Sequence, residues 1–226
     1  MTQITGFVQA ARRPGELGVH SVDHFGLTVP DLKTAETFYG AFGLDVHEDG
    51  EELGLTTHGK AHRWGRVSEG PSKKMSYISF GAFEDDLEPL RRRLQDQGVR
   101  QLDAPSGFES NGVWFRDPDG TLIEIRVAEK TSPNEKSTTK NVSSPAGVMG
   151  SQYRSAVAKV RPRRLAHILI FTADVSRAIA FYNGVVGLRL SDRSGDGIAF
   201  MHGIHGSDHH MIALAKSNGP GLHHLS

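Results

Sequence analysis

The sequence of 226 residues contains no cysteine. Without thiols, the chain can form neither disulfide bonds nor zinc–thiolate sites, which fits a reducing cytosol. The 26 basic and 26 acidic residues cancel, so no overall charge attracts nucleic acid or anionic lipid. No apolar run approaches the roughly 18 residues that span a bilayer, and the first 11 residues lack a signal-peptide pattern. We therefore expect a cytoplasmic protein that binds neither nucleic acid nor membranes.

Several common catalytic motifs are also missing. The sequence has no glycine-rich phosphate loop, no G-x-S-x-G nucleophile elbow and no H-E-x-x-H metal motif. Paired carboxylates such as Asp85-Asp86, at the start of a predicted helix, are expected to be solvated. Histidine is the unusual residue: there are 12, and six of them lie between His202 and His224. The histidines are therefore the candidate catalytic and metal-binding residues.

Two segments of the chain repeat one pattern at an offset of 143 residues. Histidine, aspartate, alanine and a Phe-Tyr pair recur at matching positions, and a Gly-Leu pair follows, displaced by one residue. Agreement at so many positions indicates a duplication. The Phe-Tyr pairs are expected to pack in the core. The matching positions are His24, Asp31, Ala35 and Phe38-Tyr39 in the first copy, and His167, Asp174, Ala178 and Phe181-Tyr182 in the second.

The local pattern of each copy predicts a strand followed by a helix. Residues 24–29 and 167–171 are apolar and β-rich, and Asp31 and Asp174 stand where a helix N-cap is expected. Further strands are predicted at 53–57, 63–67 and 75–80, a helix over 84–97, and a hairpin of 113–116 and 122–127 around residues 117–120. The sequence thus predicts an α+β fold of tandem βαβββ modules, the second module incomplete.

Composition divides the chain into three parts. Residues 1–127 are predicted to form an N-terminal domain of paired modules, and residues 165–226 part of a C-terminal domain. Residues 128–164 carry eight basic and two acidic residues, a charge of +6 that leaves −6 for the rest of the chain. Because this segment has no periodic apolar face, a basic flexible linker is predicted, in preference to a nucleic-acid-binding arm.

Taken together, these motifs resemble the vicinal oxygen chelate superfamily of glyoxalases, bleomycin-resistance proteins and extradiol dioxygenases. The resemblance rests on the repeated pattern above, on the Phe-Arg-Asp-Pro-Asp-Gly run that ends at Gly120, and on Gly219-Pro-Gly-Leu-His-His224. The C-terminal segment with the two histidine doublets, His209-His210 and His223-His224, most resembles that of type I extradiol catechol dioxygenases. That resemblance implies ring cleavage of an aromatic diol with O₂ and non-haem Fe(II), Mn(II) being possible. A homo-oligomer is also possible.

The resemblance implies roles for three histidines. Two imidazoles and one carboxylate hold the metal on one face in such enzymes. His167 is the first expected ligand, and the resemblance favours His224 over His223 as the second. His210 corresponds to a residue that is not a ligand and that handles protons during the reaction.

The third ligand is expected beyond the sequence. Aligning the copies places His24, Tyr77 and Glu124 at the three ligand positions of the first domain, where the weak middle ligand predicts a vestigial site. Glu124 follows Tyr77 by 47 residues, and the same interval after His224 gives position 271, whereas the sequence stops at Ser226. We therefore expect a shortened form of a longer protein. A complete short protein is the alternative, and it would bind Fe(II) weakly.

Two other functions remain open on the same scaffold. A glyoxalase-like isomerase or thiol transferase would use Zn²⁺, Ni²⁺ or Mn²⁺, and a bleomycin-resistance-like protein would bind its ligand without chemistry. Catechol turnover by the iron-loaded protein separates these alternatives from a dioxygenase.

Overall fold

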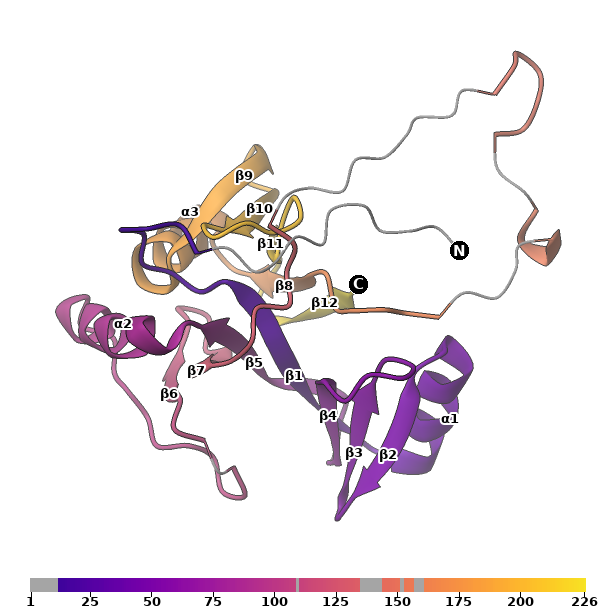
Figure 1. Ribbon diagram of the computed structural model, residues 1–226, viewed down its shortest axis with the longest axis horizontal. Helices are drawn as coiled ribbons and strands as arrows, with labels where there is room; N and C mark the ends of the chain where they lie inside the picture. The colour runs from indigo at the N-terminus through magenta and orange to yellow at the C-terminus, as the bar shows by residue number, and fades with distance from the viewer. Residues whose placement is uncertain (1–11, 109, 135–143, 151–152, 157–160) are drawn as a thin grey trace.

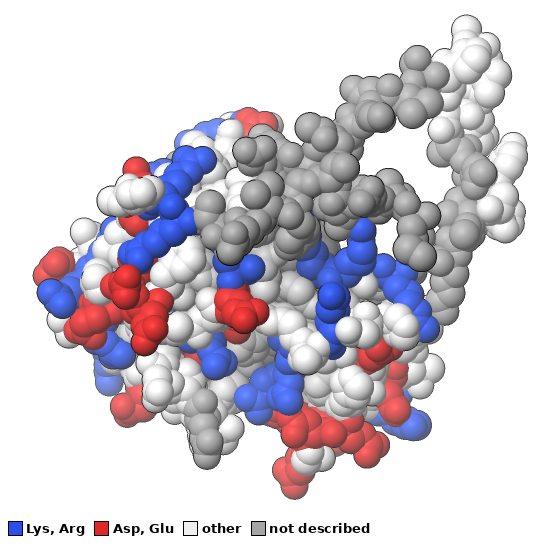
Figure 2. Space-filling view, in the orientation of Figure 1, with Lys and Arg blue, Asp and Glu red and all other residues white. Residues whose placement is uncertain are grey.

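A computed structural model describes residues 12–108, 110–134, 144–150, 153–156 and 161–226. Within these ranges the chain forms two sheets, one from each copy of the repeat (Figure 1). No helix of the described residues is long and apolar enough to cross a membrane. On the face drawn in Figure 2, acidic and basic side chains lie close together, so no area of a single charge dominates it.

The first sheet has seven strands in the order β2-β3-β4-β1-β5-β7-β6. Strand β1 is central and pairs with β4 in parallel and with β5 in antiparallel orientation. Two modules, each beginning with a strand and a helix, therefore share one sheet. The elements are β1 (Ser21–Val29), α1 (Leu32–Phe42), β2 (Asp45–Asp49), β3 (Glu52–Thr56), β4 (Arg63–Glu69), β5 (Lys74–Ala82), α2 (Glu84–Asp96), β6 (Val113–Arg116) and β7 (Leu122–Val127).

The second sheet has five strands in the order β12-β8-β11-β10-β9. Strand β8 lies between β11 and β12, as β1 lies between β4 and β5 in the first sheet. The predicted α+β fold with tandem βαβββ modules is thereby confirmed. The elements are β8 (Ile168–Thr172), α3 (Val175–Phe181), a π-helical turn η2 (Tyr182–Val186), β9 (Leu188–Ser194), β10 (Ile198–Gly203), β11 (Ile212–Lys216) and β12 (Gly221–Leu225), preceded by the short 3₁₀ helix η1 (Arg154–Ala156).

Both copies start their first helix in the predicted way. The Asp31 side chain accepts a hydrogen bond from the Thr34 backbone N–H at 3.0 Å, and Asp174 accepts one from the Arg177 N–H at 2.9 Å. Such bonds satisfy N–H groups that have no partner inside the helix. The N-cap predictions at Asp31 and Asp174 are confirmed.

The π-helical turn explains why the two Gly-Leu pairs are out of step by one residue. Gly43 and Gly187 both end their helices in the left-handed conformation, with φ of 107° and 85°. A π-helical turn accommodates one extra residue within a helix. The second copy therefore holds its inserted residue in η2 and still reaches the same glycine stop.

Two predictions about single residues are wrong. Asp86 is buried, not solvated, because it forms an ion pair with Arg12 and lies 3.9 Å from His205 Nε2. Phe38 does not pack in the core, since 61% of it is exposed on the surface of α1. Its counterpart Phe181 is partly buried and packs against the core.

Part of the segment predicted as a linker contacts the first domain. The backbone N–H groups of Thr131 and Ser132 donate to Ser21 Oγ at 2.8 and 3.0 Å, and Lys130 Nζ donates to the Ser132 carbonyl at 2.6 Å. Residues 135–143, 151–152 and 157–160 lie outside the described residues, so the flexibility of the segment stays a prediction.

Candidate metal centre

The structure brings the three predicted site histidines together on adjacent strands. His167 directly precedes β8, His224 lies on β12, and His210 lies two residues before the start of β11. His167 Nε2 and His224 Nε2 are 3.0 Å apart, and the rings of His167 and His210 have centroids 4.1 Å apart. Residues separated by up to 57 positions thus form one cluster because β8 lies between the other two strands.

The spacing of the two facing nitrogens fits a shared cation. Imidazole nitrogens lie about 2.1 Å from a bound divalent metal, so two ligands at right angles are about 3.0 Å apart. The same distance suits a hydrogen bond between a protonated and an unprotonated nitrogen. A shared metal requires a lone pair on both nitrogens, whereas the hydrogen bond requires a lone pair on only one of them.

Burial favours the neutral form of His167 and of His210. It lowers the pKa of His167, and the nearby His224 lowers it further. Burial also lowers the pKa of His210, to about 4, with the neighbouring His167 and His209 as further causes. A metal ligand must offer an unprotonated nitrogen, so at neutral pH no proton has to be removed first.

Each doublet pairs a site histidine with a neighbour that contacts its other nitrogen. His224 Nδ1 lies 2.9 Å from His223 Nδ1, and His210 Nδ1 lies 3.2 Å from His209 Nδ1. A contact at Nδ1 fixes the tautomer and the ring orientation of a histidine whose Nε2 serves the site. His223 and His209 therefore act as orienting groups for His224 and His210 in this arrangement.

No carboxylate completes the cluster within the described part of the chain. Across these residues, no group of three His, Cys, Asp or Glu side chains is placed to hold a metal ion. The nearby Asp208 carboxylate forms an ion pair with Arg164 at 2.5 Å. The two facing histidines fit the metal that the sequence implies, and a third protein ligand is not among the described residues.

An apolar surface adjoins the histidines. Cross-strand partners point to the same face of a sheet, which groups Leu169 with Ala213, Phe171 with Ala215, and Phe200 with Ala213. The Phe200 ring lies 4.9 Å from the His210 ring. The small alanines between two phenylalanines leave a shallow apolar floor that suits a flat ring.

The first copy shows how the corresponding position is filled. Gly26 pairs with Tyr77 as Leu169 pairs with His224, so the two aligned residues hold equivalent places. Burial raises the pKa of Tyr77, which keeps the phenol protonated and a poor ligand. Both Glu124 oxygens accept hydrogen bonds, from Ser79 at 2.5 Å and from Ser110. These contacts agree with a vestigial site, which stays a prediction.

Comparisons with known proteins identify the class. The family model of the Glyoxalase/Bleomycin resistance protein/Dioxygenase superfamily matches residues 21–125 and 164–225, and the chain belongs to this superfamily. The chain is 46% identical over 216 residues to "Metapyrocatechase 2" of Cupriavidus necator, covering 96% of this chain and 67% of that protein. It is 25% identical to the 3-methylcatechol 2,3-dioxygenase of Pseudomonas putida, covering 92% and 72%. Within the superfamily, the chain groups with the extradiol catechol dioxygenases.

Solved structures share the fold. The 2,3-dioxygenase LapB of Pseudomonas sp. KL28 matches with a TM-score of 0.69 at 21% identity, covering 93% of this chain and 75% of that one. The Mn(II)-bound glyoxalase of Novosphingobium aromaticivorans matches with a TM-score of 0.69 at 22% identity, covering 92% and 65%. The chain thus spans about two thirds of the length of several relatives that it matches.

Proposed function

We propose that the chain serves in extradiol cleavage of a catechol-type aromatic diol, with O₂ as co-substrate and non-haem Fe(II) as the metal. The observation that carries the proposal is the 3.0 Å approach of His167 Nε2 to His224 Nε2, with His210 against the same ring. The relationship to "Metapyrocatechase 2" supports the choice of reaction. His167 and His224 would hold the metal, and His210 would act on protons.

The metal and the protein contribute different parts of the chemistry. When bound, Fe(II) supplies Lewis acidity toward the two adjacent diol oxygens and one-electron chemistry with O₂. The apolar floor formed by Leu169, Phe171 and Phe200 would hold the ring and exclude water. The ring would then lie beside His210, which is half-buried next to Phe200.

His210 is suited to accept and return a proton. Its Nδ1 faces His209, which leaves Nε2 as the atom to accept a proton from a diol hydroxyl. Because burial lowers its pKa to about 4, the ring is neutral at pH 7 and begins each cycle as the base. Once protonated beside other imidazoles, it would readily give the proton up again.

The test is turnover of catechol by the anaerobically iron-loaded protein. Yellow ring-fission product is expected on addition of air, and none after chelation of the metal. His224→Ala is expected to abolish both iron retention on gel filtration and product formation, whereas His58→Asn, at an exposed position outside the site, keeps both. Iron retained equally by the wild-type protein and His224→Ala would contradict the ligand assignment. Retained iron without turnover would instead contradict the reaction.

A further inference from the structure

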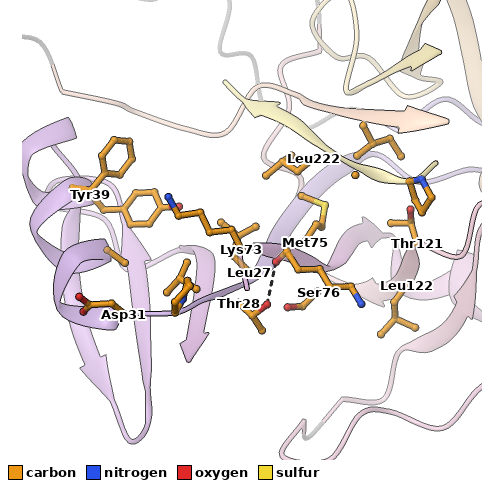
Figure 3. A pocket seen from close by; sticks show the side chains of 18 of the residues that line it. Leu27, Thr28, Asp31, Tyr39, Lys73, Met75, Ser76, Thr121, Leu122 and Leu222 are labelled. Atoms are coloured by element: carbon orange, nitrogen blue, oxygen red, sulfur yellow. Dashed lines mark hydrogen bonds between the residues drawn. The ribbon is translucent and has the colours of Figure 1, made fainter. Parts of the chain in front are cut away.

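A groove of about 970 Å³ separates helix α1 from strand β12 (Figure 3). Phe38 and Tyr39 of α1 form one wall, and Leu222 and Ile170 of the second domain form the other. In Figure 3, Tyr39 and Leu222 lie on opposite sides of the groove, and the side chain of Lys73 extends toward Tyr39. The groove is therefore largely apolar, with basic residues at its edge.

The internal repeat supplies an occupied counterpart of this groove. The offset of 143 makes Phe38 equivalent to Phe181 and Tyr39 equivalent to Tyr182. In the second copy this surface is covered: Tyr182 is fully buried, and the ring of Phe181 lies 6.2 Å from that of Phe115. The covering element is the hairpin of β6 and β7 from the first domain.

The turn of that hairpin is held through its two carboxylates. The Tyr182 hydroxyl donates to Asp117 Oδ2 at 3.1 Å. Asp119 accepts hydrogen bonds from the Ala173 backbone N–H at 3.1 Å, from Thr172 Oγ1 at 2.5 Å and from the Arg177 guanidinium at 2.9 Å. The acidic turn at residues 117–120 thus docks on a surface lined by aromatic side chains, next to the N-terminus of α3.

The corresponding surface of the first copy has the same two aromatic residues, but no turn of the described residues covers it. Phe38 is 61% exposed, and the Tyr39 hydroxyl forms no hydrogen bond with a described residue. Lys73 and Lys74 line the groove, and neither forms an ion pair with a carboxylate of the described chain. The second copy has Pro220 and Gly221 at the aligned positions and uses Arg177 instead. Both surfaces therefore place basic side chains where an acidic turn could bind, although these side chains come from different sequence positions.

We infer that the groove beside α1 is a binding site for a second β-hairpin with an acidic Asp-Pro-x-Gly turn, of the kind found at residues 113–127. Its carboxylates would meet Lys73, Lys74 and the Tyr39 hydroxyl, and an apolar strand residue would cover Phe38. The inference rests on the repeat and on the groove, and it holds whether or not the chain cleaves catechols.

The test uses a backbone-cyclised, fluorescent peptide with the sequence of residues 113–127, because a linear two-stranded hairpin is marginally stable in water. Fluorescence anisotropy is expected to show saturable 1:1 binding to the whole chain. A peptide with both turn aspartates replaced by asparagine should bind at least tenfold more weakly, as should the parent peptide with the K73E/K74E protein. Binding of the acidic peptide should also weaken with added salt.

Two exposed phenylalanines on α1 give a matched control. Phe38 lines the groove, whereas Phe42, 59% exposed, does not. Phe38→Ser should lower affinity at least tenfold, and Phe42→Ser should leave it within twofold. Absence of saturable binding, equal binding of the asparagine peptide, or equal effects of the two serine variants would overturn the proposal. So would sedimentation showing that the groove pairs two copies of the chain, with Phe38→Ser yielding a monomer and the peptide failing to compete.

Discussion

At the scale of the residue, the histidine doublets divide into one residue that faces the site and one that orients it. His210 lies against the ring of His167 yet makes no contact with a described carboxylate, and its Nδ1 is taken by His209. A group in this place can act on substrate protons without ligating the metal. The role of each imidazole can therefore be separated by substitution.

Removing His210 should uncouple turnover from metal binding. His210→Ala is expected to retain Fe(II) with an affinity within about threefold of wild type, because His167 and His224 remain. Product formation should fall by about 10² to 10⁴, the usual contribution of a positioned acid–base group. Equilibrium dialysis and the ring-fission assay measure the two effects. Loss of iron on a par with His224→Ala would mean that His210 is a ligand.

A second residue-scale prediction concerns His20, which is fully buried. Burial lowers its pKa to about 4, while the hydrogen bond to the Ala128 carbonyl opposes the shift. The unfolded chain binds this proton near pH 6.5 and the folded chain only near pH 4. The free energy of unfolding should therefore fall as pH drops from 6.5 to 4, by up to about 3 kcal/mol from this group.

The control for His20 is a side chain that does not titrate. Urea unfolding at pH 7.5, 6.0 and 5.0 should show that His20→Gln lowers stability at every pH but loses less of it on acidification. The difference between the two slopes isolates His20, because the other buried histidines remain in both proteins. Parallel slopes would show that His20 does not titrate in this range.

The convergence of the candidate ligands could be predicted from the duplication and the family resemblance, whereas contacts between distant segments could not. His167 and His224 were found from the repeat and the family resemblance, and they do lie together. The burial of Asp86 depends on Arg12 and on His205, 119 residues away, and no local pattern records that partnership. The sequence did not predict that Phe171 and Phe200 face the histidine cluster, because the pattern of an apolar strand does not indicate which face of the sheet a residue occupies.

At the scale of the element, the Tyr77 ring of β5 lies over β1 so closely that one position of β1 requires glycine. A Cβ built on Gly26 would lie 2.1 Å from Cε1 of Tyr77, whose ring is itself buried. The ring cannot move aside without displacing Phe108 and Trp114, which contact it edge-on. The place that His224 takes in the second copy is thus filled by an aromatic ring in the first.

Gly26→Ala is therefore expected to destabilise the protein by about 1–3 kcal/mol, the usual cost of overpacking a core. Gly40, inside α1, is the matched control because nothing lies within 4 Å of its built Cβ. Gly40→Ala should stabilise by roughly 0.5–1 kcal/mol through the better helix propensity of alanine. Thermal and urea unfolding measure both. Equal effects of the two alanines would contradict the packing of the Tyr77 ring over Gly26.

Element boundaries followed from the sequence where local chemistry sets them. Strands β6 and β7 match their predicted bounds because the Asp-Pro-Asp-Gly turn fixes both ends, and α2 begins at the predicted Glu84. Strand β8 begins one residue later than expected. The π-helical turn η2 was visible only as a one-residue displacement between Gly43 and Gly187. Its conformation depends on packing of Tyr182 and Val186 in the core, so the sequence alone did not specify it.

At the scale of the whole molecule, one continuous apolar core and several buried polar contacts join the two sheets. The turn at residues 117–120 docks on α3, and the Val19 N–H donates to the Val186 carbonyl at 3.2 Å. The side chain of Asp119 is only 4% exposed and ion-pairs with Arg177. Since α3 follows β8, the strand after His167, the same contacts hold the metal-site strand in place.

Both tryptophans, Trp64 and Trp114, lie in the first domain, so their fluorescence reports on that half alone. In the wild-type protein we expect fluorescence and far-UV circular dichroism to give coincident urea transitions, because the domains unfold together.

Asp119→Ala leaves the Ala173 N–H, the Thr172 hydroxyl and Arg177 without this acceptor. It should lower stability by about 3 kcal/mol and separate the two transitions. Asp103→Ala, at an exposed loop position, should change neither. Coincident transitions in Asp119→Ala, with stability within 0.5 kcal/mol of wild type, would mean that the turn does not couple the domains. The metal-site strand would then depend on the second sheet alone.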